Sequence, residues 1–229
     1  MSKSEWKRIA DQYSRIGDAR ISRVFPAVLR TLLSNGGSKL LDYGCGDGHF
    51  AALALQAGIP SVVLYDPAPR MRELAMDAVK PWNGQARVIA RVSEIETGGF
   101  DAVVWNAVWM CLPSRQECIE GLKRALSALR PGGLFVASVT HPCFRDRQFA
   151  TFRTSFDMDN YAREGMPFQV TMFDANNVVQ FTDYHWSLGE MSRQLHEAGL
   201  SLVELGEVSD LEQAPWPRGV PWLIVVARR

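Results

Sequence analysis

Three glycines, Gly44, Gly46 and Gly48, follow a short apolar run and stand among two carboxylates, Asp42 and Asp47. A strand, a glycine-rich turn and a helix together place a ligand at the helix N-terminus, at the carboxyl edge of a parallel sheet. A dinucleotide-binding loop has the pattern GxGxxG and brings backbone N–H groups to a pyrophosphate. This loop is GxGxG, and its acidic neighbours would repel a phosphate. The pattern favours a ligand that carries positive charge near the loop.

S-adenosylmethionine is a ligand of this kind, because it has a sulfonium and an α-ammonium group and no phosphate. Asp66 supports an adenosine-containing ligand, since it ends the second apolar run about 20 residues beyond the first glycine, where an acid accepts hydrogen bonds from ribose hydroxyls. Each feature alone has a structural interpretation, as a turn glycine or a helix cap. Together, in this order and spacing, they predict a cofactor site.

Apolar runs of strand length alternate with helical patterns through most of the chain. Strands are predicted at 39–43, 61–66, 86–91, 100–106 and 131–140, and helices at 49–58, 67–79 and 114–130. The last of these helices opens with a capping box of Ser114 and Glu117. This alternation indicates an α/β protein with a parallel sheet covered on both faces.

Residues 143–183 interrupt the alternation, because they are rich in aromatic residues and lack helical periodicity. Within them, FQVTMF and VVQFTDY flank DANN, which predicts a β-hairpin. A long insert of this kind is usually functional or mobile. A helix at 187–200, with a second capping box of Ser187 and Glu190, and strands at 200–207 and 221–229 follow.

Composition excludes several other classes of protein. The 229 residues include 25 Lys and Arg and 25 Asp and Glu, so the net charge of zero argues against nucleic-acid binding. No apolar run is long enough to span a bilayer, and the N-terminus has no signal-peptide core. The four cysteines have no CxxC spacing. We therefore expect a cytoplasmic protein without metal, nucleic-acid or membrane partners.

Six segments resemble those of class I S-adenosylmethionine-dependent methyltransferases. LLDYGCGDGHF resembles their first motif, VVLYDPAPRMRELA their second, FDAVVWNAVWMCLP the fourth-strand motif and ALRPGGLFVAS the segment before the fifth strand. WKRIADQY is similar to their opening helix, and YHWSLGEMSRQLHEAGL to a late segment of many small-molecule members. The resemblance covers nearly the whole chain.

The resemblance implies a Rossmann-like fold: a seven-stranded, mostly parallel sheet with a reversed final strand, helices on both faces, and an aromatic-rich lid insert after the fifth strand. It further implies one methyltransferase domain over residues 1–229. Its predicted parts are N-terminal helices and lid (1–37), a cofactor-binding core (38–142), an acceptor lid insert with the hairpin (143–186), and a C-terminal helix with the last two strands (187–229).

Carried over by position, the resemblance implies a set of residues that hold S-adenosylmethionine. They are Tyr13 as a lid, Asp42, Gly44, Cys45 and Gly46 near the amino-acid part, Asp66 at the ribose, Pro67 and Met71 at the adenine, Val92 and Ser93 near the adenine amine, and Asn106 and Ala107 at the methionine part. An acidic residue is common near the adenine amine, so Ser93 or a backbone amide must replace it here. Met110 and Cys111 stand where a His–His pair is common, so no base is expected there.

Methyl transfer is an in-line displacement that needs a general base only when the acceptor arrives protonated with a high pKa. The candidate catalytic residues are His141, His185 and Tyr13, and Tyr184 and Asp183 are further bases. Candidate walls of the acceptor pocket are Trp109, Met110, His141, Phe144, Tyr184 and Trp186. Two interpretations are open for Arg145, Arg147 and Arg153: they bind an acidic group on the acceptor, or they are surface charges.

The sequence thus predicts transfer of a methyl group to O or N of a small, aromatic or heteroaromatic metabolite. An RNA or protein acceptor is the first alternative, although NAVWM stands where NPPY would mark an exocyclic-amine methylase. A non-catalytic nucleotide-binding regulator is the second. The hairpin is also a candidate surface for a homodimer.

Overall fold

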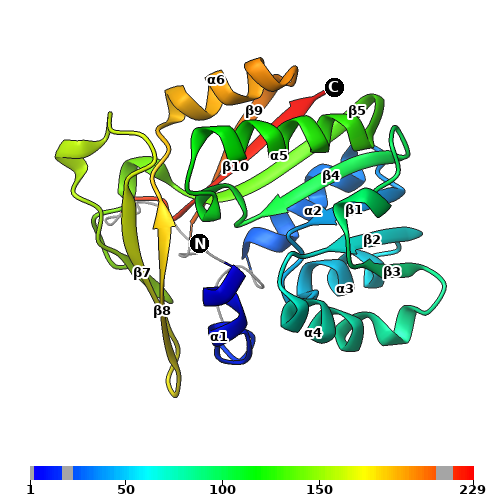
Figure 1. Cartoon of the computed structure of the whole chain (residues 1–229), viewed down its shortest axis with the longest axis horizontal. Helices are drawn as coiled ribbons and strands as arrows, with labels where there is room; N and C mark the ends of the chain where they lie inside the picture. Colours follow the sequence, from blue (N-terminus) through cyan, green and yellow to red (C-terminus); the bar gives the residue numbers. More distant parts are fainter. Residues whose placement is uncertain (1–2, 17–22, 210–218) are drawn as a thin grey trace.

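The computed structural model of the protein describes residues 3–16, 23–209 and 219–229. Positions 1–2, 17–22 and 210–218 of the predicted N-terminal and C-terminal parts lie outside the described residues. The described residues form a seven-stranded sheet in the order β3-β2-β1-β4-β5-β10-β9, with a separate three-stranded sheet beside it (Figure 1).

The strands of the large sheet are β1 (Lys39–Tyr43), β2 (Ser61–Tyr65), β3 (Ala86–Ile89), β4 (Phe100–Asn106), β5 (Leu129–Thr140), β9 (Ser201–Val208) and β10 (Trp222–Arg228). Strands β1 to β5 pair in parallel, and β10 is antiparallel to both β5 and β9. The predicted mostly parallel sheet with a reversed final strand is therefore confirmed. Strand β1 lies between β2 and β4, which makes its end the centre of the carboxyl edge.

Helices cover both faces of this sheet, as its apolar strands require. They are α1 (Lys3–Tyr13), α2 (Phe25–Ser34), α3 (His49–Gln56), α4 (Pro69–Val79), α5 (Arg115–Ala128) and α6 (Leu188–Ala198). Figure 1 shows α5 and α6 together on one face and α2, α3 and α4 on the other. Helix α1 lies between α4 and β8 of the small sheet.

Both predicted capping boxes form only in part. The Ser114 hydroxyl accepts the Glu117 N–H at 3.2 Å, but it also donates to the Glu117 carboxylate, which does not reach back to the backbone. The Ser187 hydroxyl accepts the Glu190 N–H, whereas the Ser187 N–H donates to Glu164 at 2.9 Å. Glu190 instead binds Arg115, so tertiary contacts replace the local ones.

The aromatic-rich insert forms the small antiparallel sheet of β6 (Phe152–Thr154), β7 (Pro167–Phe173) and β8 (Val178–Tyr184). Strands β7 and β8 are the hairpin predicted from the sequence, and it extends away from the large sheet (Figure 1). Its buried residues include Phe168, Val170 and Phe181, which join the main apolar core. The insert is thus packed on the sheet at the end that carries the ligand loops. Its role as a lid stays a prediction.

Two glycines in helices give a matched test of the packing under α5. A Cβ on Gly121 would lie 2.8 Å from the Trp105 ring, whereas a Cβ on Gly189 would meet only the end of the Arg193 side chain, at 3.6 Å. Overpacking costs about 1–3 kcal/mol, and replacing a helical glycine by alanine gains about 1 kcal/mol. We expect Gly121→Ala to lower the free energy of unfolding in urea and Gly189→Ala to raise it. A Gly121→Ala protein as stable as Gly189→Ala would contradict the close contact.

Candidate active site

The glycine loop after β1 has two glycines that serve packing and one that leaves space. A Cβ on Gly44 would lie 2.5 Å from the Val108 side chain, and one on Gly48 would lie 2.9 Å from the Ala75 backbone. Gly46 has a positive φ of 55°, and nothing lies within 4 Å of its Cβ position. The loop is therefore fixed at both ends, and its middle borders open space.

The Asp66 carboxylate connects this loop to the one after β2. It accepts the Gly46 N–H at 3.0 Å and the Ala68 N–H at 2.8 Å, so the two loops share one anchor. Burial raises the pKa of Asp66 to about 6, although these two backbone hydrogen bonds act in the opposite direction. A carboxylate oxygen has more than one lone pair, so Asp66 still has capacity for ribose hydroxyls.

Asp42 is the most unfavourably placed charge at this edge of the sheet. It is 1% exposed, and among the described residues neither carboxylate oxygen has a hydrogen-bond partner. Burial, with added repulsion from Asp66 and Asp47, raises the pKa of Asp42 to about 8. A buried carboxyl group without a partner is stabilised by a cation or a donor group that a ligand supplies.

The end of β4 presents a further unpaired group and a strained residue. The Asn106 side-chain oxygen accepts the Ser138 hydroxyl at 3.0 Å, while its amide nitrogen is buried without a partner among the described residues. Ala107 has a φ of 56°, which is rare outside glycine and recurs at functional sites. Its N–H donates to the Ser138 carbonyl at 2.9 Å, which holds this conformation.

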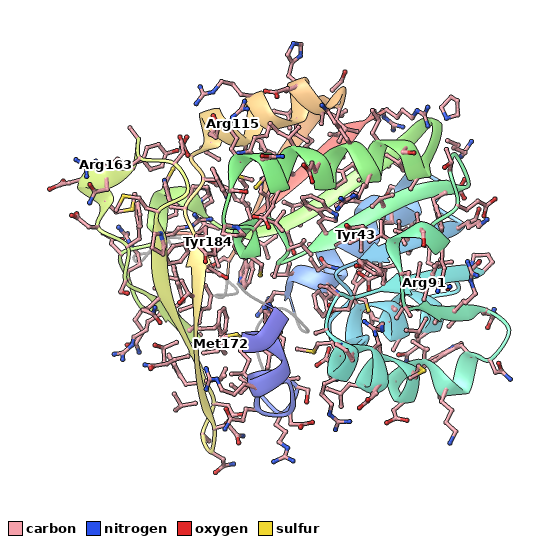
Figure 2. All side chains as sticks on the ribbon, viewed as in Figure 1. Tyr43, Arg91, Arg115, Arg163, Met172 and Tyr184 are labelled. Carbon is pink, nitrogen blue, oxygen red and sulfur yellow. The ribbon has the colours of Figure 1, made fainter. Side chains whose placement is uncertain are left out.

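These groups surround a cavity of about 690 Å³, within the usual range for small-molecule sites. The predicted cofactor residues that line it are Tyr13, Asp42, Gly44, Cys45, Gly46, Asp66, Pro67, Met71, Val92, Asn106 and Ala107. Ser93 is absent from the lining, which leaves Val92 as the residue from that loop. Of the predicted acceptor residues, Tyr184 lines this cavity, and Figure 2 shows it at the end of β8, toward the middle of the molecule.

A second, much smaller cavity of about 30 Å³ adjoins the first and shares Trp6, Tyr13, Ala107 and Cys111 with it. Its other walls are Met110, Thr140, Thr151, Phe152, Val170, Met172, Phe181, Asp183 and Trp222. Figure 2 shows Met172 beside helix α1, in agreement with this lining. The small cavity therefore lies between α1, the insert sheet and the ends of β4 and β5.

A family model described as "Methyltransferase domain" matches residues 15–205, most of the chain. The chain belongs to this methyltransferase family. No curated protein sequence matches the chain. The predicted family, fold and enzyme class are confirmed, and S-adenosylmethionine is the methyl donor of the class.

Solved structures of methyltransferases have the same fold. The CcbJ methyltransferase of Streptomyces caelestis is 17% identical, with a TM-score of 0.72 over 100% of this chain and 99% of its own. An S-adenosylmethionine-dependent methyltransferase of Mesorhizobium loti is 21% identical, with a TM-score of 0.66 over 89% and 96%. The 1,6-didemethyltoxoflavin-N1-methyltransferase of Burkholderia thailandensis, solved with 1,6-didemethyltoxoflavin and S-adenosylhomocysteine bound, is 21% identical, with a TM-score of 0.64 over 99% and 86%.

The two histidines predicted as bases of the methyltransferase line neither cavity. Nδ1 of His185 faces the Arg145 guanidinium at 3.2 Å, so it accepts, and Nε2 donates to the Tyr161 carbonyl at 2.8 Å. Burial and Arg145 lower the pKa of His185 to about 4, so the ring is neutral. Nδ1 of His141 accepts the Cys143 N–H, and its Nε2 lies 3.2 Å from Glu207. Both rings are engaged in structural contacts.

Three aromatic residues predicted as acceptor walls, Trp109, Phe144 and Trp186, also line neither cavity. Trp109 is fully buried and donates its indole N–H to Gln194 at 2.8 Å. The Trp186 ring packs over Gly165. Met110 does line the small cavity. It lies beside Trp109 in the short 3-10 helix η4 (Trp109–Cys111), and of these two predicted acceptor residues Met110 alone reaches a cavity.

The predicted arginines have different surroundings. Arg145 is 1% exposed and donates to the carbonyls of Thr140 and Tyr184. Arg147 pairs with Asp146 at 2.6 Å, and Arg153 is exposed on β6. None of the three lines either of these two cavities.

Sequence reasoning missed several cavity residues, of which Trp6 is the most informative. Trp6 and Tyr13 are seven residues apart on α1, so they lie on one helix face, and their rings meet edge to face at 4.9 Å. The seven-residue spacing in the sequence therefore indicates that Trp6 lies on the same face as the predicted lid residue Tyr13. Cys111 and Phe181 gave no such signal, because their place depends on strand ends meeting in three dimensions.

Two further observations concern metal ions and membranes. Among the described residues, no group of three His, Cys, Asp or Glu side chains is placed to hold a metal ion. No described helix is both long and apolar enough to cross a membrane.

The buried carboxyl group of Asp42 predicts a pH dependence. Its pKa is raised from 3.8 to about 8 in the folded protein, so the folded state keeps a proton that the unfolded chain loses between these values. The ligand-free wild type should therefore lose stability relative to Asp42→Asn as pH rises from 4 to 8, by up to about 1.4 kcal/mol per pH unit. Urea unfolding across this range measures the difference. Asp77→Asn, exposed on α4, is the control and should follow the wild type; a flat difference for Asp42→Asn would contradict the raised pKa.

Proposed function

We propose that this methyltransferase transfers the methyl group of S-adenosylmethionine to O or N of a small, aromatic or heteroaromatic acceptor. The observation that carries the proposal is the shared wall of the two cavities. Ala107, at the methionine end of the cofactor cavity, also lines the small cavity, together with Trp6, Tyr13 and Cys111. An acceptor at this wall lies next to the methyl group to be transferred.

The residues of the large cavity fit the proposed ligand. When bound, S-adenosylmethionine supplies an electrophilic methyl group on a sulfonium, which a nucleophile displaces in line. The unpaired carboxyl group of Asp42 suits the cationic end of the ligand, and the unpaired amide of Asn106 suits its carboxylate. Asp66 holds the ribose, and Met71, 2% exposed, packs against the adenine with Pro67.

The aromatic groups at the shared wall orient the acceptor and exclude water. The Trp6, Tyr13 and Phe181 rings form one cluster, with centroids 4.9 to 6.1 Å apart. Such faces stack on a flat acceptor and attract a sulfonium through cation–π contact. Holding two reactants in attack geometry supplies roughly 7–11 kcal/mol of the barrier reduction. Positioning, rather than either histidine, carries the proposed mechanism.

One similar structure supports a small acceptor. The Burkholderia thailandensis protein is named for its action on 1,6-didemethyltoxoflavin, a small molecule that is bound in that structure. The zero net charge of this chain gives no attraction to nucleic acid. A cytoplasmic location and a homodimer through the hairpin stay predictions.

The proposed acceptor class is tested with labelled S-adenosylmethionine and extract of the source cells, separated by ultrafiltration after the reaction. We expect label in small-molecule products, whose masses then identify the acceptor. Heat-treated enzyme is the control. Label found only in the macromolecular fraction would refute the small-molecule acceptor in favour of RNA or protein.

The proposed ribose contact predicts a loss of cofactor affinity in Asp66→Ala. A hydrogen bond to a charged group contributes about 1.5–3 kcal/mol, which corresponds to about 10- to 100-fold in the Kd of S-adenosylhomocysteine. Isothermal titration calorimetry measures the Kd, and circular dichroism checks that the variant folds. Asp77→Asn should keep the wild-type Kd. Unchanged affinity in folded Asp66→Ala would remove Asp66 from the site.

A further inference from the structure

The small cavity has a polar corner in an otherwise apolar wall. Asp183, on β8, is 2% exposed and lines this cavity, and the Cys111 thiol lies 3.7 Å from its carboxylate. Thr140, at the end of β5, lines the same cavity, and among the described residues its buried hydroxyl has no hydrogen-bond partner. A buried hydroxyl without a partner indicates a group that a ligand supplies.

A buried arginine lies behind this corner. Arg145 donates to the Thr140 carbonyl at 2.9 Å, and its guanidinium lies 5.0 Å from the Phe168 ring, the residue paired with Asp183 across the hairpin. Within the described part of the chain, no carboxylate lies within 4 Å of Arg145. Burial lowers the pKa of Arg145 to about 10, and Asp183 is the charge that most opposes this effect. Asp183 is therefore the group that most stabilises the buried guanidinium charge across the end of the hairpin.

We propose that Asp183, backed by Arg145, binds the N–H or O–H group of the acceptor, so that the enzyme selects neutral acceptors with such a donor and rejects acceptors with an acidic group there. This inference rests on the proposed function, since it concerns the acceptor of the same reaction. The small cavity, about 30 Å³, has room for one donor group, as a water molecule occupies about this volume. The acceptor ring then lies at the shared wall, against Trp6 and Tyr13.

The same placement accounts for the proton released by transfer. The acceptor N or O forms its bond to the methyl carbon as the sulfur–methyl bond breaks, and that electron pair stays on sulfur. The acceptor loses its N–H or O–H proton to the Asp183 carboxylate, from which the proton passes to solvent. A carboxylate within reach of the donor serves as the general base that neither His141 nor His185 provides.

Ligand binding tests the inference without a turnover assay. The probes are benzimidazole, which has an N–H donor, N-methylbenzimidazole, which lacks it, and benzoate, which is acidic. Saturation-transfer NMR and calorimetry measure their binding to the protein loaded with S-adenosylhomocysteine. We expect the wild type to bind benzimidazole at least about tenfold more tightly than either of the other two probes. The reason is that the benzimidazole N–H donates a hydrogen bond to the Asp183 carboxylate, which the other two probes cannot do.

Two isosteric variants separate the charge of Asp183 from a general effect. Asp183→Asn should lose most of the preference for benzimidazole over benzoate, since the amide repels no anion. Asp159→Asn removes an exposed carboxylate from the same insert and should keep the wild-type preference. Both variants should bind S-adenosylhomocysteine as the wild type does, which checks their folding.

Several results would overturn the inference. They are equal binding of benzoate and benzimidazole by the wild type, an unchanged preference in Asp183→Asn, and failure of all three probes to bind the cofactor-loaded protein. In each case S-adenosylhomocysteine still binds, so the proposed function survives. If S-adenosylhomocysteine itself does not bind the wild type, the proposed function fails first and the inference fails with it.

Discussion

The fold keeps the Asp42 carboxyl group buried and unpaired at the end of its central strand, and the cofactor cavity is organised around this unfavourable group. Strand β1 lies between β2 and β4, and the Asp42 side chain is buried where it meets the large cavity. Asp66, directly after the neighbouring strand β2, adds to the negative potential at Asp42. A group that destabilises the empty fold in this way gains most from a cationic ligand, because binding supplies the missing partner. The acidic loop and the parallel sheet are therefore parts of one arrangement.

A second constraint is the coupling of the two ligand loops through Asp66. Since Asp66 accepts from Gly46 and from Ala68, the glycine loop after β1 and the loop after β2 have one fixed spacing. Gly44 and Gly48 fix the outer ends of the first loop against neighbouring elements. Of these three glycines, only Gly46 has open space at its Cβ position. A site with such preformed backbone loses little conformational entropy on binding.

Most residues predicted for the cofactor line the large cavity, whereas most of those predicted for the acceptor line neither cavity, and the difference has a physical reason. The parallel sheet, the hairpin and the glycine loop follow from local patterns of strand, turn and helix, which a single sequence records. The environment of His185, by contrast, is set by Tyr161 and Arg145, and that of Trp109 by Gln194, all distant in sequence. Aromatic and histidine residues at strand ends face either a cavity or the core, and only the packed partners decide between them. Asp183 appeared among the candidate bases, yet its position beside Thr140 required the structure.

The two halves of the site come from different parts of the fold, and this separation has a consequence for specificity. The ends of β1, β2 and β4 line the large cavity, whereas the small cavity adds side chains from α1, β7 and β8. Residues such as Met172 and Phe181 line only the small cavity, so in the proposed site their size and polarity would set the acceptor without touching the cofactor contacts. Arg145 donates to the end of β5, and Asp183 on β8 is the charge that most stabilises it, so a change in the hairpin that moved Asp183 would also weaken this stabilisation of a buried charge. In the proposed site the insert can therefore vary in shape around the acceptor ring, while the position of Asp183 relative to Arg145 restricts the chemical type of group that reaches the methyl donor.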